Sequence, residues 1–167
     1  MRRIIRPRRR KAGPTAWVLG GGAARGASQL GLIQALLEIG IAQPTAVFGT
    51  SVGALDGAVI AARPNLDGAE LLRRLWLSKP AREVFHIHSL GVIASRLAGQ
   101  LGILSANPVK ALIDQFTAAT GCTDFEDLAV PLGVVATDLL AGSPVAFRSG
   151  PLAPALMASA ALRGSLR

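Results

Sequence analysis

Residues 46–54 read AVFGTSVGA, a short apolar run that leads directly into a cluster of small residues. The apolar part has the length of a buried strand, and a small-residue helix over about 52–62 follows and stops before Pro64. Residues 49–53 fit the pattern Gly-x-Ser-x-Gly, in which a serine occupies a strained turn between a strand and a helix and presents its hydroxyl outward. We therefore predict a nucleophile elbow with Ser51 as the catalytic residue and Gly49, Thr50, Val52 and Gly53 around it.

A second strand, glycine loop and helix precede the first. Residues 15–19 predict a strand, and from Ala27 onward apolar residues at a helical period predict a helix that ends at Gly40. The intervening GGGAARG (20–26) is not a phosphate-binding loop, because Ala27-Ser28 replaces the Lys-Ser/Thr pair, and it lacks the spacing of a dinucleotide fingerprint. The remaining interpretation is a nest of backbone N–H groups at a helix N-terminus.

Parallel strands would place this nest beside Ser51, where it would serve as an oxyanion hole. For Arg25 we favour bracing of the loop over binding of a substrate phosphate. The residues expected to form the hole are Gly20, Gly21, Gly22, Ala23, Arg25 and Gly26.

The rest of the chain continues to alternate between strands and helices. We predict a helix N-capped by Asp67, an irregular stretch over 80–89, helices over 90–101 and from Asn107-Pro108 to about Gly121, and a strand over 132–138. A turn at 142–144, a hairpin strand over 145–148 and a helix over 153–162 follow. The sequence therefore predicts an α/β fold whose sheet is mainly parallel, with a hairpin at one side.

The charge is concentrated at one end. The formal net charge is +8, but seven of the 18 basic residues lie in the first 11 positions, which leaves the remainder almost neutral. We expect residues 1–13 to be a disordered basic arm with weak affinity for anionic membrane surfaces, and residues 14–167 to be the folded domain. The near-neutral body and 4% aromatic content argue against specific nucleic-acid binding. No secretory signal or 18-residue apolar run is present, so we expect a cytoplasmic protein, or one peripheral to the membrane.

Metal and cofactor chemistry is not expected. Cys122 is the single cysteine, and only His86 and His88 could join it as ligands. We interpret Cys122 as a buried apolar side chain and the two histidines as loop residues. They lie too early in the chain for the usual order of a Ser-Asp-His triad.

The two glycine motifs together resemble the patatin-like phospholipase family. Residues 19–27 look like its glycine-rich oxyanion loop, and residues 49–54 look like its elbow. Residues 124–128 and 131–138 resemble its later strand region, and 158–162 resemble a helical segment near its second catalytic motif. Ala23 stands where many members have glycine, a change that keeps the backbone donor. The resemblance implies a three-layer α/β fold with a mainly parallel central sheet flanked by helices, and a serine acyl hydrolase of the phospholipase or esterase kind that acts on lipids or small esters.

The resemblance also implies a Ser-Asp dyad, in which an aspartate of a later Asp-Gly-Gly or Asp-Gly-Ala motif is the base. In the family, the segment similar to 158–162 continues into Pro-Gly and then the strand with that aspartate, whereas RGSLR (163–167) follows it here. We therefore expect a domain that is incomplete at its C-terminus and lacks the dyad aspartate. The alternative is a non-catalytic remnant or lipid-binding module of the same fold.

Three aspartates of this sequence are candidates to replace the missing base. Asp67-Gly68-Ala69 matches the motif by chance, because it lies at a predicted helix cap only 16 residues after Ser51. Asp56 is on the elbow helix and should point away from the serine hydroxyl. Asp138 ends a predicted parallel strand on the catalytic side and is the least implausible substitute, although its family counterpart is not the dyad aspartate.

Overall fold

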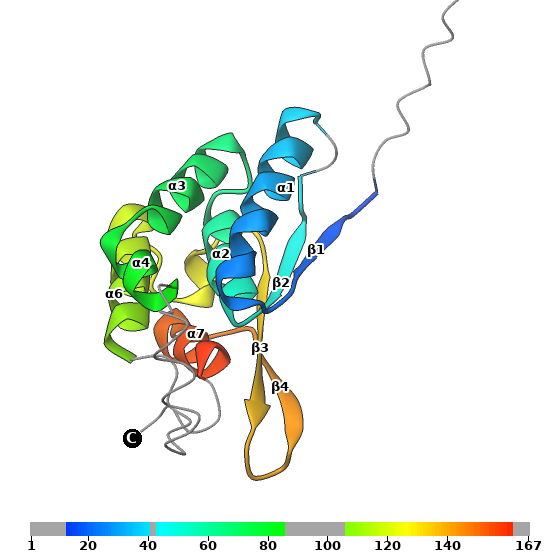
Figure 1. Ribbon diagram of the computed structural model, residues 1–167. Helices are drawn as coiled ribbons and strands as arrows, with labels where there is room; N and C mark the ends of the chain where they lie inside the picture. Colours follow the sequence, from blue (N-terminus) through cyan, green and yellow to red (C-terminus); the bar gives the residue numbers. More distant parts are fainter. Residues whose placement is uncertain (1–12, 41–42, 86–105, 162–167) are drawn as a thin grey trace, which may run out of the picture.

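A computed structural model describes residues 13–40, 43–85 and 106–161 (Figure 1). The expected basic arm, apart from Gly13, the expected helix over 90–101, and His86 and His88 lie outside the described residues. The elements are β1 (Ala16–Leu19), α1 (Gly26–Glu38), β2 (Ala46–Thr50), α2 (Val52–Ala62), α3 (Leu66–Trp76), α4 (Lys79–Phe85), α6 (Ala106–Thr120), β3 (Leu132–Asp138), β4 (Ser143–Phe147) and α7 (Leu152–Ala160), with 3-10 turns at Ala23–Arg25 and Phe125–Asp127.

The sheet has the order β1-β2-β3-β4. The first three strands are parallel, with Val47 opposite both Trp17 and Leu132, and β4 runs antiparallel to β3. The α/β class and the mainly parallel sheet, with a hairpin at one side, are thereby confirmed, whereas the described residues form two layers rather than the expected three. Because the three parallel strands follow one another in one direction, right-handed crossovers bring their helices to the same face.

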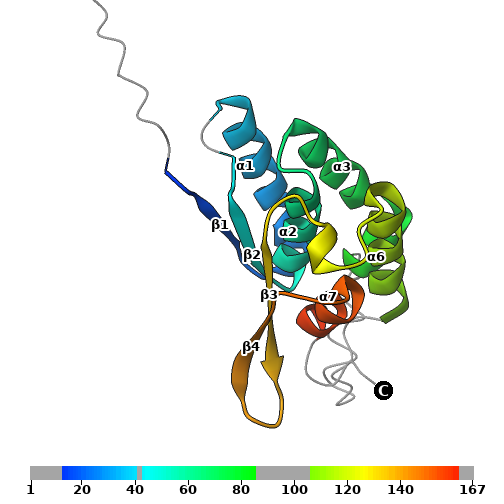
Figure 2. The ribbon, with the colours of Figure 1, turned by 180° about the vertical axis from the view of Figure 1, so that it is seen from behind.

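Figures 1 and 2 show the helices gathered on that face of the sheet. No element in the described ranges covers the other face, where Val18 of β1 is 78% exposed.

Helix α2 lies at the centre of the molecule, between the sheet and the helices α3, α6 and α7 (Figure 1). Nine of its 11 residues are buried, in agreement with a sequence that is apolar on all sides apart from Asp56. Gly57 allows α2 to approach the sheet, because a side chain there would lie 3.1 Å from a methyl group of Val47. The core forms around this helix, so the residue just before it, Ser51, is anchored to the most enclosed element.

Two predictions of local structure were wrong. Asn65 caps α3, since its Oδ1 accepts the N–H of Gly68 at 3.1 Å, and Asp67 is inside the first turn. Residues 79–85 form a helix, α4, rather than an irregular stretch. Pro80 falls in its first turn, where a missing N–H costs no hydrogen bond, and the burial of Ala81 and Val84 stabilises the helix.

None of the helices in the described ranges has both the length and the apolar character needed to cross a bilayer. Cys122 is buried, as expected, with its Sγ 3.5 Å from the carbonyl oxygen of Asp127.

Candidate active site

Ser51 occupies the turn between β2 and α2 and is held in a strained backbone conformation. Its φ is 55° and its ψ is −126°, a region that residues with a side chain rarely adopt. Such a conformation costs about 1–3 kcal/mol and persists only where the surrounding structure enforces it. The side chain is half-buried, at the N-terminus of α2.

Two glycines make this turn possible. A Cβ at residue 49 would lie 2.6 Å from the backbone nitrogen of Ala54 and would strike the carbonyl oxygen of Gly53. A Cβ at residue 53 would strike the carbonyl of Leu19 and lie 2.6 Å from that of Gly20. Because both obstacles are backbone, a side chain could not be accommodated by a rotamer change. The first glycine lets the strand meet the helix, and the second lets the helix meet the loop after β1.

The backbone N–H of Ser51 is held by a residue far away in the sequence. It donates to Oγ of Ser159, on α7, at 2.7 Å, and the Ser159 hydroxyl donates to the carbonyl oxygen of Val135 at 2.6 Å. Since Val135 is the β3 partner of Thr50, the hydroxyl bridges β2 and β3 at the point where β2 turns into the elbow. Ser159 is 8% exposed, so this bridge is shielded from water.

The glycine loop lies beside the elbow because β1 and β2 are parallel and end together, with Leu19 opposite Gly49. A Cβ at Gly21 would be 3.3 Å from the Cβ of Ser51. Further along, a Cβ at Gly26 would lie 2.6 Å from a methyl group of Val52 and 2.9 Å from the Trp76 ring. The structure therefore brings Gly21 to the serine and packs the start of α1 against the start of α2.

Other residues of the loop at 20–26 are held by hydrogen bonds of their own. The Gly20 carbonyl accepts a hydrogen bond from Nε2 of Gln29 at 2.7 Å, and the N–H of Arg25 donates to the Gly22 carbonyl at 3.1 Å. The exposed Arg25 side chain lies along Gly22, a position that favours bracing of the loop. Ala23 has a φ of 49°, a left-handed conformation that costs a residue with a Cβ about 1–2 kcal/mol. The alanine keeps its N–H, but at the expense of strain that glycine would not have.

Asp138 and Asp67, two of the aspartates considered as a base, make no hydrogen bond to Ser51 in the described structure. Oδ1 of Asp138 accepts the N–H groups of Leu140 and Ala141 at 2.8 and 3.1 Å, and these bonds lower the pKa of its exposed carboxyl. Asp67 lies on α3, where the following Gly68 is needed because a Cβ would strike the carbonyl of Arg63. In the described parts of the chain, no hydrogen bond joins the Ser51 hydroxyl to a carboxylate or an imidazole.

Asp56 is 2% exposed on α2. Its Oδ1 accepts the indole N–H of Trp76 at 3.0 Å, and its Oδ2 has no hydrogen-bond partner among the described residues. Burial raises the pKa of this carboxyl to about 7, against the opposing effect of the Trp76 hydrogen bond. The side chain is therefore largely neutral below that pH, and it faces the helices rather than the serine.

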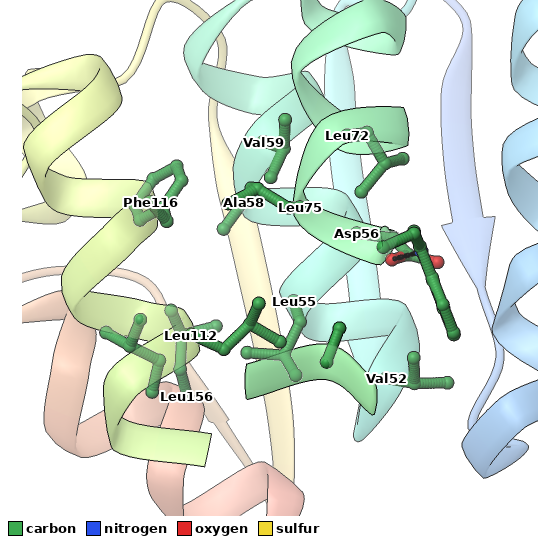
Figure 3. A pocket seen from close by; sticks show the side chains of 13 residues that line it. Val52, Leu55, Asp56, Ala58, Val59, Leu72, Leu75, Leu112, Phe116 and Leu156 are labelled. Atoms are coloured by element: carbon green, nitrogen blue, oxygen red, sulfur yellow. Dashed lines mark hydrogen bonds between the residues drawn. The ribbon is translucent and has the colours of Figure 1, made fainter. Parts of the chain in front are cut away.

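A small apolar cavity adjoins this carboxyl, on the side of α2 that faces the other helices (Figure 3). Its volume is about 30 Å³, and its lining includes Val52 and Leu55 but not Ser51. Such a space holds a water molecule rather than an acyl chain. The cavity is therefore a gap in the core beside a buried acid, and it does not include the edge where Ser51 meets the glycine loop. Within the described ranges, no group of three potential ligand side chains is arranged to hold a metal ion.

Sequence reasoning did not assign roles to Ser159 or to the Asp56–Trp76 pair. Their partners lie 108 and 20 residues away, so no local pattern could have indicated them.

Comparison with known proteins identifies the family of the chain. Residues 17–164 match the model of the patatin-like phospholipases. An uncharacterized NTE family protein of Mycobacterium tuberculosis is 36% identical over 149 residues, which are 89% of this chain and 38% of the relative. A neuropathy target esterase of Drosophila melanogaster is 32% identical over 148 residues, which are 88% of this chain and 10% of the esterase.

The chain thus spans less than half the length of these relatives. Among solved structures, ExoU of Pseudomonas aeruginosa, in complex with SpcU, aligns with a TM-score of 0.49 at 20% identity, over 88% of this chain and 38% of that one. The match to the family model covers both glycine motifs and the helix with Ser159. The chain therefore belongs to the patatin-like phospholipase family.

Proposed function

We propose that this chain carries the nucleophile of a serine acyl hydrolase that acts on lipids or small esters. The observation that carries the proposal is the strained conformation of Ser51, held between two glycines that admit no side chain, with Gly21 directly beside it. Strain of this kind persists only where the surrounding contacts enforce it, and strained residues are concentrated at active sites.

In the proposed reaction, Oγ of Ser51 bonds to the carbonyl carbon of the ester while its proton passes to a base. The resulting oxyanion collapses, the protonated base gives its proton to the departing oxygen, the alcohol leaves, and an acyl-serine ester remains. Water then attacks this ester, which releases the carboxylic acid and restores the serine. The roles of the surrounding residues follow from the charge that develops in these steps.

The oxyanion would be stabilised by backbone N–H groups of the loop at residues 20–26 and by the N-terminus of α2. The first N–H groups of α2 have no acceptor within the helix, and the helix dipole favours negative charge there. Loss of one such donor typically costs about 2.7–4 kcal/mol in the barrier. The N–H of Ser51 itself is engaged by Ser159 and is not counted among the donors.

For the base we propose the aspartate of a Ser-Asp dyad, as the resemblance implies, which is not among the six aspartates of this sequence. The surroundings of Asp56 and Asp138 argue against either carboxylate as the base: Asp56 is buried against Trp76, and Asp138 is bound to the backbone of a turn. Residues 14–167 would form the domain, and the basic residues 1–13 would add a weak, salt-sensitive attraction to anionic membranes.

The test is covalent labelling of the full chain by a fluorophosphonate probe. We expect labelling of the wild type and of Ser143→Ala, a control at an exposed serine on the hairpin, and none of Ser51→Ala. Labelling that survives Ser51→Ala would contradict the assignment.

The second candidate is a lipid-binding module without catalysis. It is favoured by the absence, in the described parts, of a base bonded to the Ser51 hydroxyl. Retention of an acyl lipid with no labelling of Ser51 would support it against hydrolysis.

A further inference from the structure

The β3–β4 hairpin extends past the edge of the sheet that carries Ser51. β3 pairs with β2 only as far as Val135, opposite Thr50, and its last three residues pair with β4 alone. At about 3.3 Å per residue, this overhang is roughly 10 Å before the turn begins. Figures 1 and 2 show the hairpin projecting away from the helices in both views. The tip is therefore held out on the same side as the candidate active site.

Two adjacent leucines form this tip. Leu139 is 64% exposed and Leu140 is fully exposed, in a turn where polar residues are usual. The other exposed leucines, such as Leu32 on α1 and Leu77 after α3, are single positions on the body of the molecule. Scattered apolar residues of that kind need no explanation, whereas a pair at the end of a projecting element does.

Three backbone N–H groups at the tip are hydrogen-bonded within the turn, as an apolar environment requires. The Asp138 carboxylate accepts the N–H groups of Leu140 and Ala141, and its backbone carbonyl accepts the N–H of Gly142 at 2.8 Å. Three donors at the turn are thus satisfied internally, which avoids the cost of taking unpaired N–H groups out of water. The leucines can enter a lipid phase while the carboxylate stays behind them, at the level of the polar headgroups.

We propose that Leu139 and Leu140 insert into the surface of a zwitterionic lipid bilayer or micelle and thereby bring the Ser51 edge of the sheet to that surface. A lipid surface fits better than a protein partner, because a two-residue tip offers far less than the about 800 Å² per partner that stable protein interfaces bury. The negative charge of Asp138 favours zwitterionic over anionic headgroups. The proposed insertion is argued from the structure of the hairpin alone. Only the idea that insertion brings Ser51 to its substrate rests on the proposed function.

The test is flotation of the full chain with phosphatidylcholine vesicles in 0.5 M salt, which screens any attraction by the basic residues 1–13. The double variant Leu139→Ser/Leu140→Ser should lower the ratio of bound to free protein at least tenfold. The matched control, Leu32→Ser/Leu77→Ser, removes the same side chains from exposed positions elsewhere and should bind like the wild type. In addition, Leu140→Trp should shift its emission to the blue when vesicles are added, and Leu32→Trp should not.

Equal binding by the tip variant and the wild type, or an equal loss in the control, would overturn the proposal. So would a change of molecular mass in solution for the tip variant alone, which would identify a second copy as the partner. Flotation requires no chemistry. If Ser51 is not labelled while the tip variant still loses vesicle binding, the proposed function fails and this inference stands.

Discussion

Two units of this molecule share one sequence pattern, a strand, a glycine-rich turn and a helix, yet they differ in how tightly they are enclosed. In β1–α1, only Gly26 and Ile33 of the 13 helical residues are buried, and the loop at 20–26 is largely exposed. In β2–α2, nine of 11 helical residues are buried and the turn is closed by backbone contacts on two sides. The comparison teaches that one motif can form either a tightly enclosed turn or an open, exposed loop, depending on what packs around it.

The largest expected effect comes from placing a methyl group in each turn. Gly53→Ala forces Cβ into the backbone at Leu19 and Gly20, so we expect the free energy of unfolding to fall by more than about 4 kcal/mol, or folding to fail. Gly20→Ala meets no atom within 4 Å and should change stability little. Urea unfolding of the two variants measures the difference. Similar free energies of unfolding for Gly53→Ala and Gly20→Ala would show that the turn at Ser51 is packed no more tightly than the loop after β1.

The burial of Asp56 on α2 also predicts that the free energy of unfolding depends on pH. Because the folded pKa of Asp56 is about 7 and the pKa of a free aspartate is 3.8, the unfolded chain loses this proton first, and stability falls as pH rises from about 4 to 7. The loss should reach at most about 4 kcal/mol. Asp56→Asn should remove this slope, whereas Glu38→Gln, at an exposed acid on α1, should leave it in place. Urea unfolding between pH 4.5 and pH 8 provides the measurement, and an unchanged slope in Asp56→Asn would mean that the carboxyl is hydrated.

A smaller loss of stability is expected when the hydrogen bond between Ser159 of α7 and the backbone of Ser51 is removed. Ser159→Ala leaves the N–H of Ser51 and the carbonyl of Val135 without their partner, a cost of about 1–3 kcal/mol. Fluorophosphonate labelling of Ser51 should slow by about tenfold or more, and Ser159→Thr, which keeps the hydroxyl, should recover most of the rate. If Ser159→Ala unfolds more easily but labels at the wild-type rate in native buffer, the bridge supports the fold without positioning the nucleophile.

The smallest effect concerns the open loop. Ala23→Gly relieves a left-handed alanine but adds freedom to the unfolded chain, so stability should rise by less than about 1 kcal/mol. Thermal unfolding measures this, with Ala24→Gly, which has no such strain to relieve, as the control. A loss of stability in Ala23→Gly equal to that of the control would show that the loop stores no strain.

Most of the fold could be predicted from the sequence because it depends on local signals. The ends of α1 and α6 were correctly placed by Gly40 and Gly121, which adopt φ values of 67° and 76°. The cap of α3 was misplaced by two residues because Asn65 and Asp67 are both good capping residues and the sequence alone does not separate them. The contacts of Ser159 and Asp56 join distant segments, and they depend on how helices pack rather than on any local pattern.

The bridge between Ser51 and Ser159 also fixes an order of events during synthesis. Its two ends are separated by 108 residues, and at roughly 5–20 residues per second a ribosome needs about 5–20 s to travel between them. During that interval Ser51 has been synthesised, but the Ser159 hydroxyl that accepts its N–H has not. The turn at Ser51 is therefore expected to reach its final conformation only after α7 has docked.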